Sequence, residues 1–394
     1  MYKLREPPMT FELLDSIHRI DRRQWNQLWQ QAGGDAGLSP FLQHEFLAAL
    51  EDSGCTTAKS GWVPRHLIVK SATGELRGAM PLYEKHHSYG EYVFDWGWAE
   101  AYQRNGLNYY PKLLAAIPFT PASGPRLALS DELDRAATLA DLHRFLNDYC
   151  RSEGLSSWHC LFLPPNEVEL WQQAGSHSRI GCQFHWLNRG YESFDHFLES
   201  FNSRKRKAVR KERAQVTSQG VTLQRLTGSD ISAADWDRFY RFYHTTYLKR
   251  SGSGGYLNRD FFAAIGDALA EQLLMVNGRR DGNTIASALC FFDRQSLYGR
   301  YWGCREEVSG LHFEACYYQG IEFAIERGLQ RFDPGAQGEH KIQRGFEPTI
   351  TWSQHWLADP RFMAAVEDFL RRETPAVEAY RDDCASYLPF RQEG

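Results

Sequence analysis

One segment of this chain occurs twice. Residues 41–52 read Phe-Leu-Gln-His-Glu-Phe-Leu-Ala-Ala-Leu-Glu-Asp, and residues 256–267 read Tyr-Leu-Asn-Arg-Asp-Phe-Phe-Ala-Ala-Ile-Gly-Asp. Trp25 with Trp236, and Trp96-Gly97 with Trp302-Gly303, recur at nearly the same offset. An offset of about 210 residues is a domain length and exceeds any solenoid period. The repeat therefore predicts a duplicated domain.

Bulk composition agrees with a two-domain globular protein. The chain has 394 residues, of which 42% are hydrophobic and 24% charged. Its 12 Trp, 19 Tyr and 24 Phe residues favour sheet-rich packing. Because the net charge is −4, any affinity for nucleic acid has to come from a local basic patch.

Cysteine usage and the N-terminal sequence predict a cytoplasmic protein without metal. The eight cysteines are scattered and form no Cys-x-x-Cys pair, which favours reduced thiols. Cys182 and His185 have the spacing of half a zinc site, but no second half follows. The N-terminus is charged and no apolar stretch of about 18 residues occurs, so neither a signal peptide nor a membrane span is expected.

Hydrophobic periodicity predicts similar elements in both halves. In the first half we expect helices at 21–31, 43–52 and 131–153, the last capped by Ser130, and strands at 66–70, 76–83, 91–96 and 157–163. In the second half we expect helices at 236–250, 259–270, 312–327 and 359–374, and strands at 272–277, 284–292, 296–303, 329–333 and 351–357. This order predicts an α/β (α+β) fold with mixed, mostly antiparallel sheets, divided into domains 1–180 and 181–394.

Three stretches of the chain are similar to segments of a known protein family. They are the basic segment 203–213, the segment 310–328, and the segment 332–348, which contains Asp-Pro-Gly, a lysine and Arg-Gly-Phe. Each half resembles the GNAT acyltransferase fold, in tandem. The whole chain is similar to the FemAB-like N-acyltransferases of bacteria, a peptidoglycan biosynthesis/recognition family. The resemblance implies transfer of an acyl or aminoacyl group from acyl-CoA or aminoacyl-tRNA to a small-molecule or peptidoglycan-precursor amine, with no tightly bound cofactor.

The loop after strand 296–303 corresponds to the donor-binding loop of the resemblance. The candidate cofactor-binding residues are Arg305, Ser309, Gly310, Leu311 and His312. Gly310 and the start of the next helix favour a phosphate, because backbone N–H groups there attract anions. Glu306 and Glu307 place two carboxylates in the same loop.

The segment after strand 329–333 carries the candidate catalytic residues Asp333, Glu339, His340, Lys341 and Arg344. Acyl transfer to an amine needs a base for the ammonium proton and a positive group for the oxyanion. Asp333, Glu339 or His340 could serve as the base, and histidine suits that role best by its pKa. A surface loop with ordinary charges, or a capping network, is the alternative. Because the first half has no counterpart, we expect the second half to hold the chemistry.

A basic helix is expected at 203–219, and its candidate phosphate-binding residues are Arg204, Arg206, Lys207, Arg210, Lys211 and Arg213. They could contact a tRNA, a lipid headgroup or a cofactor phosphate. A solvated helix face, or one paired with acidic residues of the same protein, is the alternative.

Candidate substrate residues are Arg300, Trp302, Trp96 and Tyr102. Arg300 lies between aromatic residues on one face of a strand, and a buried arginine requires an anion. Two functions remain open at this point: an N-acyltransferase, and a non-catalytic module of the same fold that binds a cell-wall precursor or RNA.

Overall fold

The computed structural model describes residues 9–336 and 338–391, which divide into two compact units. Unit 1 contains the described residues up to Gly181 together with Thr351–Val377, and unit 2 contains Cys182–Ile350 and the described residues from Glu378 onward. The predicted domains, 1–180 and 181–394, differ from this division because the chain returns to unit 1 for Thr351–Val377.

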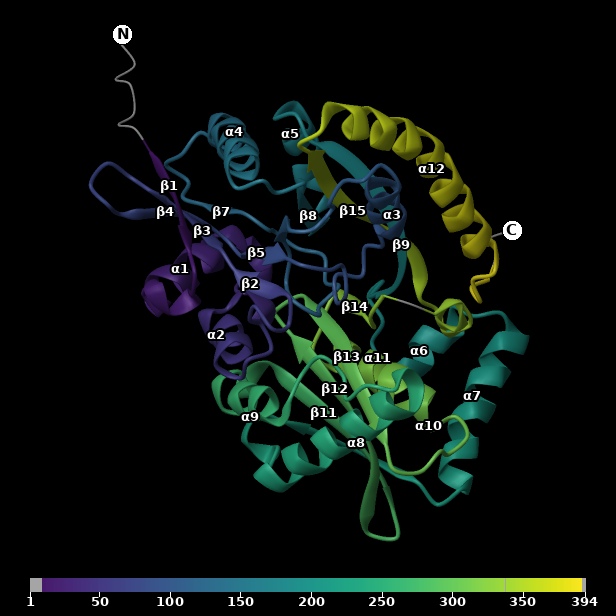
Figure 1. Cartoon of the computed structure of the whole chain (residues 1–394). Coiled ribbons are helices and arrows are strands. Elements are labelled where there is room, and N and C mark those ends of the chain that lie inside the picture. Colours follow the sequence, from purple (N-terminus) through teal and green to yellow (C-terminus); the bar gives the residue numbers. More distant parts are fainter. Residues whose placement is uncertain (1–8, 337, 392–394) are drawn as a thin grey trace. The chain divides into compact units, whose positions relative to one another are not determined.

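Unit 1 combines two sheets with five helices of its own (Figure 1). The helices are α1 (Arg22–Ala32), α2 (His44–Asp52), α3 (Trp96–Arg104), α4 (Arg135–Ser152) and α5 (Val168–Gln173). The strands are β1 (Thr10–Leu14), β2 (Trp62–Pro64), β3 (His66–Lys70), β4 (Leu76–Met80), β5 (Leu82–Lys85), β6 (Lys112–Ala115), β7 (Ala128–Leu129) and β8 (Ser157–Leu163). One antiparallel sheet has the order β1-β3-β4-β7. In the other, β2, β5 and β6 are antiparallel, whereas β6 and β8 are parallel.

Unit 2 repeats this plan. Its helices are α6 (Phe194–Glu199), α7 (Ser203–Ser218), α8 (Ala233–Ser251), α9 (Arg259–Ala268), α10 (Leu311–Phe313) and α11 (Gln319–Glu326), with one π-helical turn at Glu314–Tyr318. Its strands are β10 (Thr222–Thr227), β11 (Leu273–Arg280), β12 (Asn283–Phe292), β13 (Ser296–Cys304) and β14 (Arg331–Asp333). They pair in that order, antiparallel except for the parallel pair β13–β14.

Two long strands and one long helix contribute residues to both units: β9 (His177–Leu187), β15 (Glu347–Leu357) and α12 (Pro360–Ser386). The unit 2 part of β9 pairs with β14, and the unit 1 part of β15 pairs with β8. All of β8 is buried, so it needs a partner on each side. β15 supplies one of those partners, which is why Thr351–Leu357 belongs to unit 1.

Each unit has its own apolar core. In unit 1, Leu67, Met80, Leu113 and Trp158 pack between sheet and helices. In unit 2, Trp186, Phe197, Ile321, Phe332 and Phe346 form the corresponding cluster. All nine side chains are nearly or fully buried.

The structure confirms the predicted mixed, mostly antiparallel fold class and the duplication. Both units follow the order helix, helix, antiparallel strands, helix, and a last strand parallel to its neighbour. The repeated segments form α2 and α9, each preceded by a Trp-bearing helix. The prediction that Trp96-Gly97 matches Trp302-Gly303 is wrong, because Trp96 opens α3 whereas Trp302 lies in β13.

Two local predictions are also wrong. Residues 91–96 form no strand: Tyr92 has φ 62°, which breaks extended structure, and α3 begins at Trp96. The helix expected at 131–153 begins at Arg135, because Asp134 rather than Ser130 caps it by accepting from Ala137 N. In both cases local backbone chemistry set the boundary.

Candidate functional site

A pocket of about 510 Å³ lies in unit 2 between the C-terminal half of α8, the end of β13 and the loop that leads into α10. We call it the donor pocket. Its lining includes the predicted residues Trp302, Ser309, Leu311 and His312. Gly310, with φ 81°, sets the start of α10, and Arg305 lines a neighbouring pocket instead. Gly303 allows α8 to lie directly on β13, since a Cβ there would sit 2.2 Å from the carbonyl carbon of Phe242.

The charge of the donor pocket is less negative than the sequence suggests. Glu306 accepts hydrogen bonds from Arg280 and from Arg305, the latter at 2.5 Å, and these bonds lower its pKa. Lys249 and Arg250 of α8 also line the pocket. Of the two loop carboxylates, Glu306 is therefore neutralised locally, and the pocket presents cations that an anionic donor would need.

His312 stands in the wall of this pocket beside a second histidine. Its ring lies 5.3 Å from the ring of Trp302 and 6.4 Å from that of His340. Burial, then the nearby Arg250, lowers the pKa of His312 to about 4. The pKa of His340 is lowered as well, by burial and by Lys341, and its Nε2 lies 2.9 Å from the Tyr317 hydroxyl. Both imidazoles are therefore neutral at physiological pH and able to accept a proton.

Asp333 and Arg300 form a buried ion pair. The Arg300 guanidinium donates to both Asp333 carboxylate oxygens, at 3.2 and 2.7 Å. Burial opposes the charge, but Arg300 and the neighbouring His185 hold the pKa of Asp333 well below its usual range. Asp333 is fully buried and both of its oxygens accept from Arg300, so an acceptor amine cannot reach it. The sequence predicts an anion beside the buried Arg300, and that anion is Asp333. The ion pair therefore explains the burial of Arg300 without a bound substrate.

Lys341 lies next to this pair and is 2% exposed. Its Nζ donates to the Gly335 carbonyl at 2.7 Å, and burial lowers its pKa to about 8 despite the attraction of Asp333. The amine keeps most of its charge at neutral pH. It adds positive potential to the region of His312, whose pKa it helps to lower.

The two remaining catalytic candidates have other partners. Glu339 accepts a hydrogen bond from the Tyr380 hydroxyl at 2.7 Å. Arg344 donates to both carboxylate oxygens of Glu212 and stacks on Phe313, 3.5 Å from the ring centroid. The structure therefore brings His340 and Lys341 close to His312 but engages Asp333, Glu339 and Arg344 in internal contacts.

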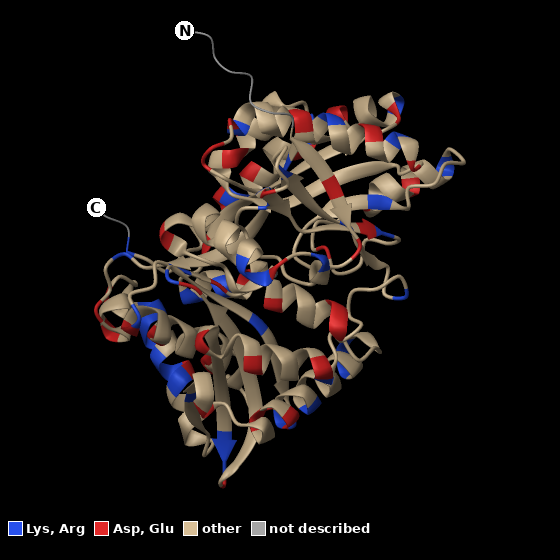
Figure 2. Ribbon diagram, turned by 90° about the vertical axis from the view of Figure 1, so that its left-hand side faces the viewer, with Lys and Arg blue, Asp and Glu red and all other residues tan. Residues whose placement is uncertain are grey.

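The predicted basic helix is α7, capped by Asn202, and Figure 2 shows Lys and Arg concentrated along it. Arg213 is not on its open face, because it donates to Glu314 and Glu322. Arg210 pairs with Asp195 at 2.9 Å and stays exposed. The other predicted cations on α7 are exposed or half-buried: Arg204, Arg206, Lys207 and Lys211.

Two of the candidates for substrate binding, Trp96 and Tyr102, belong to unit 1. Tyr102 belongs to an apolar cluster of unit 1, where its ring packs on Phe362 at 4.0 Å. Trp96 is 41% exposed and its ring lies 5.0 Å from that of Tyr89. Burial in the core removes Tyr102 from contact with a ligand.

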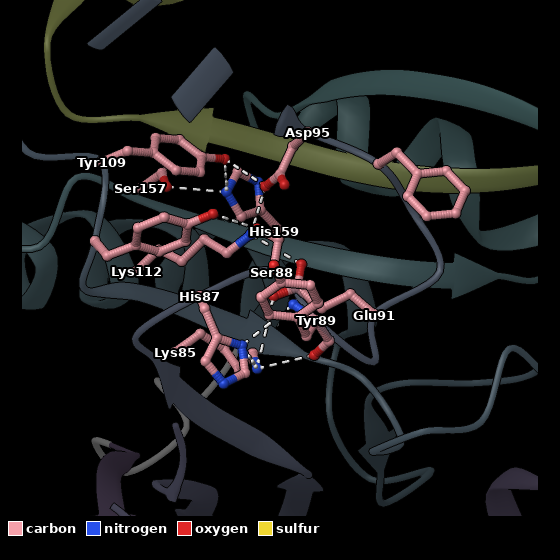
Figure 3. Close-up of polar contacts among 12 residues, drawn as sticks. Lys85, His87, Ser88, Tyr89, Glu91, Asp95, Tyr109, Lys112, Ser157 and His159 are labelled. Atoms are coloured by element: carbon pink, nitrogen blue, oxygen red, sulfur yellow. Dashed lines mark hydrogen bonds and ion pairs between the residues drawn. The ribbon is translucent and has the colours of Figure 1, made fainter. Parts of the chain in front are cut away.

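Sequence reasoning missed a buried charged network in unit 1 (Figure 3). Lys112 on β6 donates to Glu91 at 2.8 Å and also to Asp95. Tyr109 donates to Asp95 and lies 3.0 Å from His159 on β8. Lys85 lies 3.9 Å from Glu91, and burial lowers its pKa to about 7. The signal that could have revealed the network is Lys112 at the head of the apolar run Leu-Leu-Ala.

A family comparison decides what kind of protein this is. The family model for FemAB-like proteins, described as peptidoglycan biosynthesis/recognition, matches residues 16–392. The chain belongs to the FemAB-like family. This confirms the resemblance and supports, at the level of class, acyl or aminoacyl transfer connected with peptidoglycan. A comparison with the curated proteins gives no significant match.

Solved structures share the fold of this FemAB-like chain. FemX matches with a TM-score of 0.53 at 13% identity, over 88% of this chain and 98% of FemX. The C-terminal domain of a putative lysylphosphatidylglycerol synthetase from Agrobacterium fabrum matches with a TM-score of 0.52 at 10% identity, over 90% and 97%. A conserved protein of unknown function from Bacteroides thetaiotaomicron gives 0.52 at 11%, over 89% and 100%. At these identities the likeness concerns the fold.

Within residues 9–336 and 338–391 of the FemAB-like chain, no three His, Cys, Asp or Glu side chains gather as a metal site would require. No helix in the same ranges combines the length and apolar character needed to span a bilayer.

Proposed function

We propose that unit 2 is an N-acyltransferase in which the donor pocket receives the activated acyl end of the donor. The observation that carries this proposal is the neutral imidazole of His312 in the wall of a pocket that also presents Lys249 and Arg250. A neutral base beside fixed cations is what aminolysis of an ester or thioester requires.

In the proposed reaction the acceptor amine nitrogen attacks the carbonyl carbon of the donor, forming the new C–N bond. His312 accepts the proton that this nitrogen loses. The carbonyl oxygen carries the negative charge until the C–S or C–O bond to the donor breaks, and the leaving thiol or hydroxyl receives a proton from the imidazolium. Arg250 lines the same pocket and is the cation we expect nearest the oxyanion. His340 and Lys341 help to lower the pKa of His312 and so keep its imidazole neutral before the reaction.

Both donor classes carry phosphates, and the cations offer sites for them. Lys249 and Arg250 suit a phosphate close to the reacting end. The exposed residues Arg204, Lys207 and Lys211 of α7 suit a longer polyanion such as tRNA. We therefore keep acyl-CoA and aminoacyl-tRNA as donors, and a small amine or a peptidoglycan precursor as acceptor. A cytoplasmic location stays a prediction.

Thermal unfolding with acetyl-CoA, free CoA, and charged or uncharged tRNA tests the donor. A ligand at about 100 times its dissociation constant stabilises the folded protein by roughly 2.7 kcal/mol. Stabilisation by CoA would identify an acyl-CoA enzyme. Stabilisation by tRNA that disappears in an R204Q/K207Q/K211Q variant would identify an aminoacyl transferase. If neither class of ligand raises the unfolding temperature, the proposed donor chemistry is wrong.

The binding-module alternative rests on a specific observation: Asp333, Glu339 and Arg344 are all engaged in internal contacts. Transfer assays with wild-type protein and His312→Gln separate the two functions. Turnover that falls in the variant while donor binding survives supports the transferase. Donor binding without turnover in the wild-type protein supports the module.

A further inference from the structure

A second pocket of unit 2, with a volume of about 670 Å³, has no role in the proposed transfer. It lies between α8 and the β11–β12 hairpin, the long hairpin that projects at the bottom of Figure 1. We call it the hairpin pocket. Its charged lining residues are Asp230, Asp235, Arg238, Arg241, Arg279 and Arg305.

Internal ion pairs account for only part of this charge. Arg238 donates to Asp235 at 2.7 Å, and Arg305 donates to Glu306 at 2.5 Å. Asp235 also accepts from the Ser232 backbone in the capping box of α8. Among the residues that the structure describes, no carboxylate lies within ion-pair distance of Arg241 or Arg279. Asp230 is the one remaining carboxylate in the lining, so the pocket is left with a net positive charge.

Two hydrogen bonds fix the position of the Arg279 guanidinium. Its Nη1 donates to Gln224 Oε1 and its Nη2 to the Gly282 carbonyl, both at 3.0 Å. Arg241 is held more loosely, by its Nε and the Asp237 carbonyl at 3.3 Å. Of the five N–H donors on each guanidinium, most stay available to a ligand. Arginines from a helix and from a strand thus line one concave site, where the pocket walls strengthen their field.

We propose that the hairpin pocket binds a small ligand through a phosphate or diphosphate group. Guanidinium forks pair with phosphate oxygens in a bidentate manner, and a dianion can engage Arg241 and Arg279 together. Neutral donors in the lining suit the further oxygens of a tetrahedral group: the Thr284 hydroxyl, and the Asn283 amide, which has a second N–H besides the one that donates to the Asp281 carbonyl. The proposal goes beyond acyl transfer and stands whether or not unit 2 is a transferase.

The test is calorimetric titration of the full chain with inorganic pyrophosphate as the probe. We expect saturable binding that weakens by about tenfold or more in Arg241→Ala and in Arg279→Ala, since each variant removes one charged contact. Arg294→Ala is the matched control, because Arg294 is exposed in the same unit but outside the pocket, and its binding should equal that of the wild-type protein. Arg279→Gln is a second variant that preserves part of the side chain in case Arg279→Ala disturbs the hairpin.

Several outcomes would overturn the proposal. Absence of pyrophosphate binding to the wild-type protein at millimolar concentration would contradict it. So would binding to the Arg241→Ala/Arg279→Ala variant as tight as to the wild type. Equal affinity for succinate would contradict a preference for phosphate. Equal weakening in Arg294→Ala would mean that binding is a general effect of surface charge. The donor experiments above use other ligands and the α7 variant, so failure of one proposal leaves the other intact.

Discussion

Each unit buries a cation against a carboxylate where its two parallel strands meet. In unit 1 the cation is Lys112 on β6, beside Asp95 and His159. In unit 2 it is Arg300 on β13, beside Asp333 and His185. Both networks are buried: the main residues of the unit 1 network are at most 4% exposed, and Asp333, His185 and Lys341 of unit 2 at most 2%. They differ in that Lys341 lies within electrostatic reach of His312, in the wall of the donor pocket. The duplicated network is thus structural, and chemistry is expected where a pocket adjoins it.

The largest expected effect comes from removing the unit 1 cation. Lys112→Met would leave Glu91 and Asp95 buried without their hydrogen-bonded cation, so we expect the free energy of unfolding to fall by about 5 kcal/mol. Urea denaturation measures it. Lys70→Met is the matched control, because its pair with Glu12 is exposed and worth at most about 1 kcal/mol. Equal losses in both variants would show that the buried network does not stabilise unit 1.

The corresponding substitution in unit 2 should lower the free energy of unfolding by a smaller amount. Arg300→Met leaves a single carboxylate, Asp333, with His185 and Lys341 still nearby, and we expect a loss of about 3 kcal/mol. The same denaturation experiment applies, with Arg259→Met of an exposed pair as the control. A loss greater than that of Lys112→Met would reverse the comparison between the units.

The rate of acyl transfer should respond differently to histidine substitutions in the two units. His312→Gln removes the proposed base, and we expect the transfer rate to fall by about 100-fold with little change in stability. His159→Gln alters the unit 1 network and should leave the rate per folded molecule unchanged. Transfer assays normalised to folded protein test both. A comparable rate loss in His159→Gln would place chemistry in unit 1.

Acid should destabilise both units through their buried histidines. Burial lowers the pKa of His159 to about 3 and that of His185 to about 4, from 6.5. The unfolded chain therefore takes up these protons first, so their stabilising contribution is complete above pH 6.5 and is lost as the pH falls towards 4. Each histidine contributes a slope of up to about 1.4 kcal/mol per pH unit. Stability measured from pH 7 to 4.5 should show a smaller slope in His159→Gln, and an unchanged slope would refute a neutral buried His159.

Much of the fold could be predicted because local signals were strong. Strands β3 and β8 match their predicted bounds, whereas α1 differs by one residue at each end and α2 by one residue at its start. The strand prediction for 91–96 was wrong because alternating aromatic residues suggest a strand, whereas the backbone turns at Tyr92. The acidic residues of this segment, Glu91 and Asp95, accept hydrogen bonds from Lys112. The contacts of Lys112 with Glu91 and Asp95 join residues distant in the sequence, so no local sequence pattern predicts them.

The site was predictable in part for the same reason. A histidine after a glycine-containing loop indicated His312, and the structure places it in the pocket wall. The partners of Asp333 and Arg344 could not be foreseen, since Arg300 and Glu212 lie 33 and 132 residues away. Four arginines gather in the hairpin pocket from α8, β11 and the loop directly after β13, a convergence that only the folded chain creates.

Strands β9 and β15 each contribute residues to both units, and this affects how the protein folds during its synthesis on the ribosome. Strand β8 is complete early, but its partner Trp352–Leu357 is translated only after residues Cys182–Ile350 of unit 2. Until then one edge of a fully buried strand has no neighbour, and such edges are prone to pair with other chains. Unit 1 therefore cannot mature ahead of unit 2, and truncation before residue 351 should yield aggregating protein rather than a folded first half.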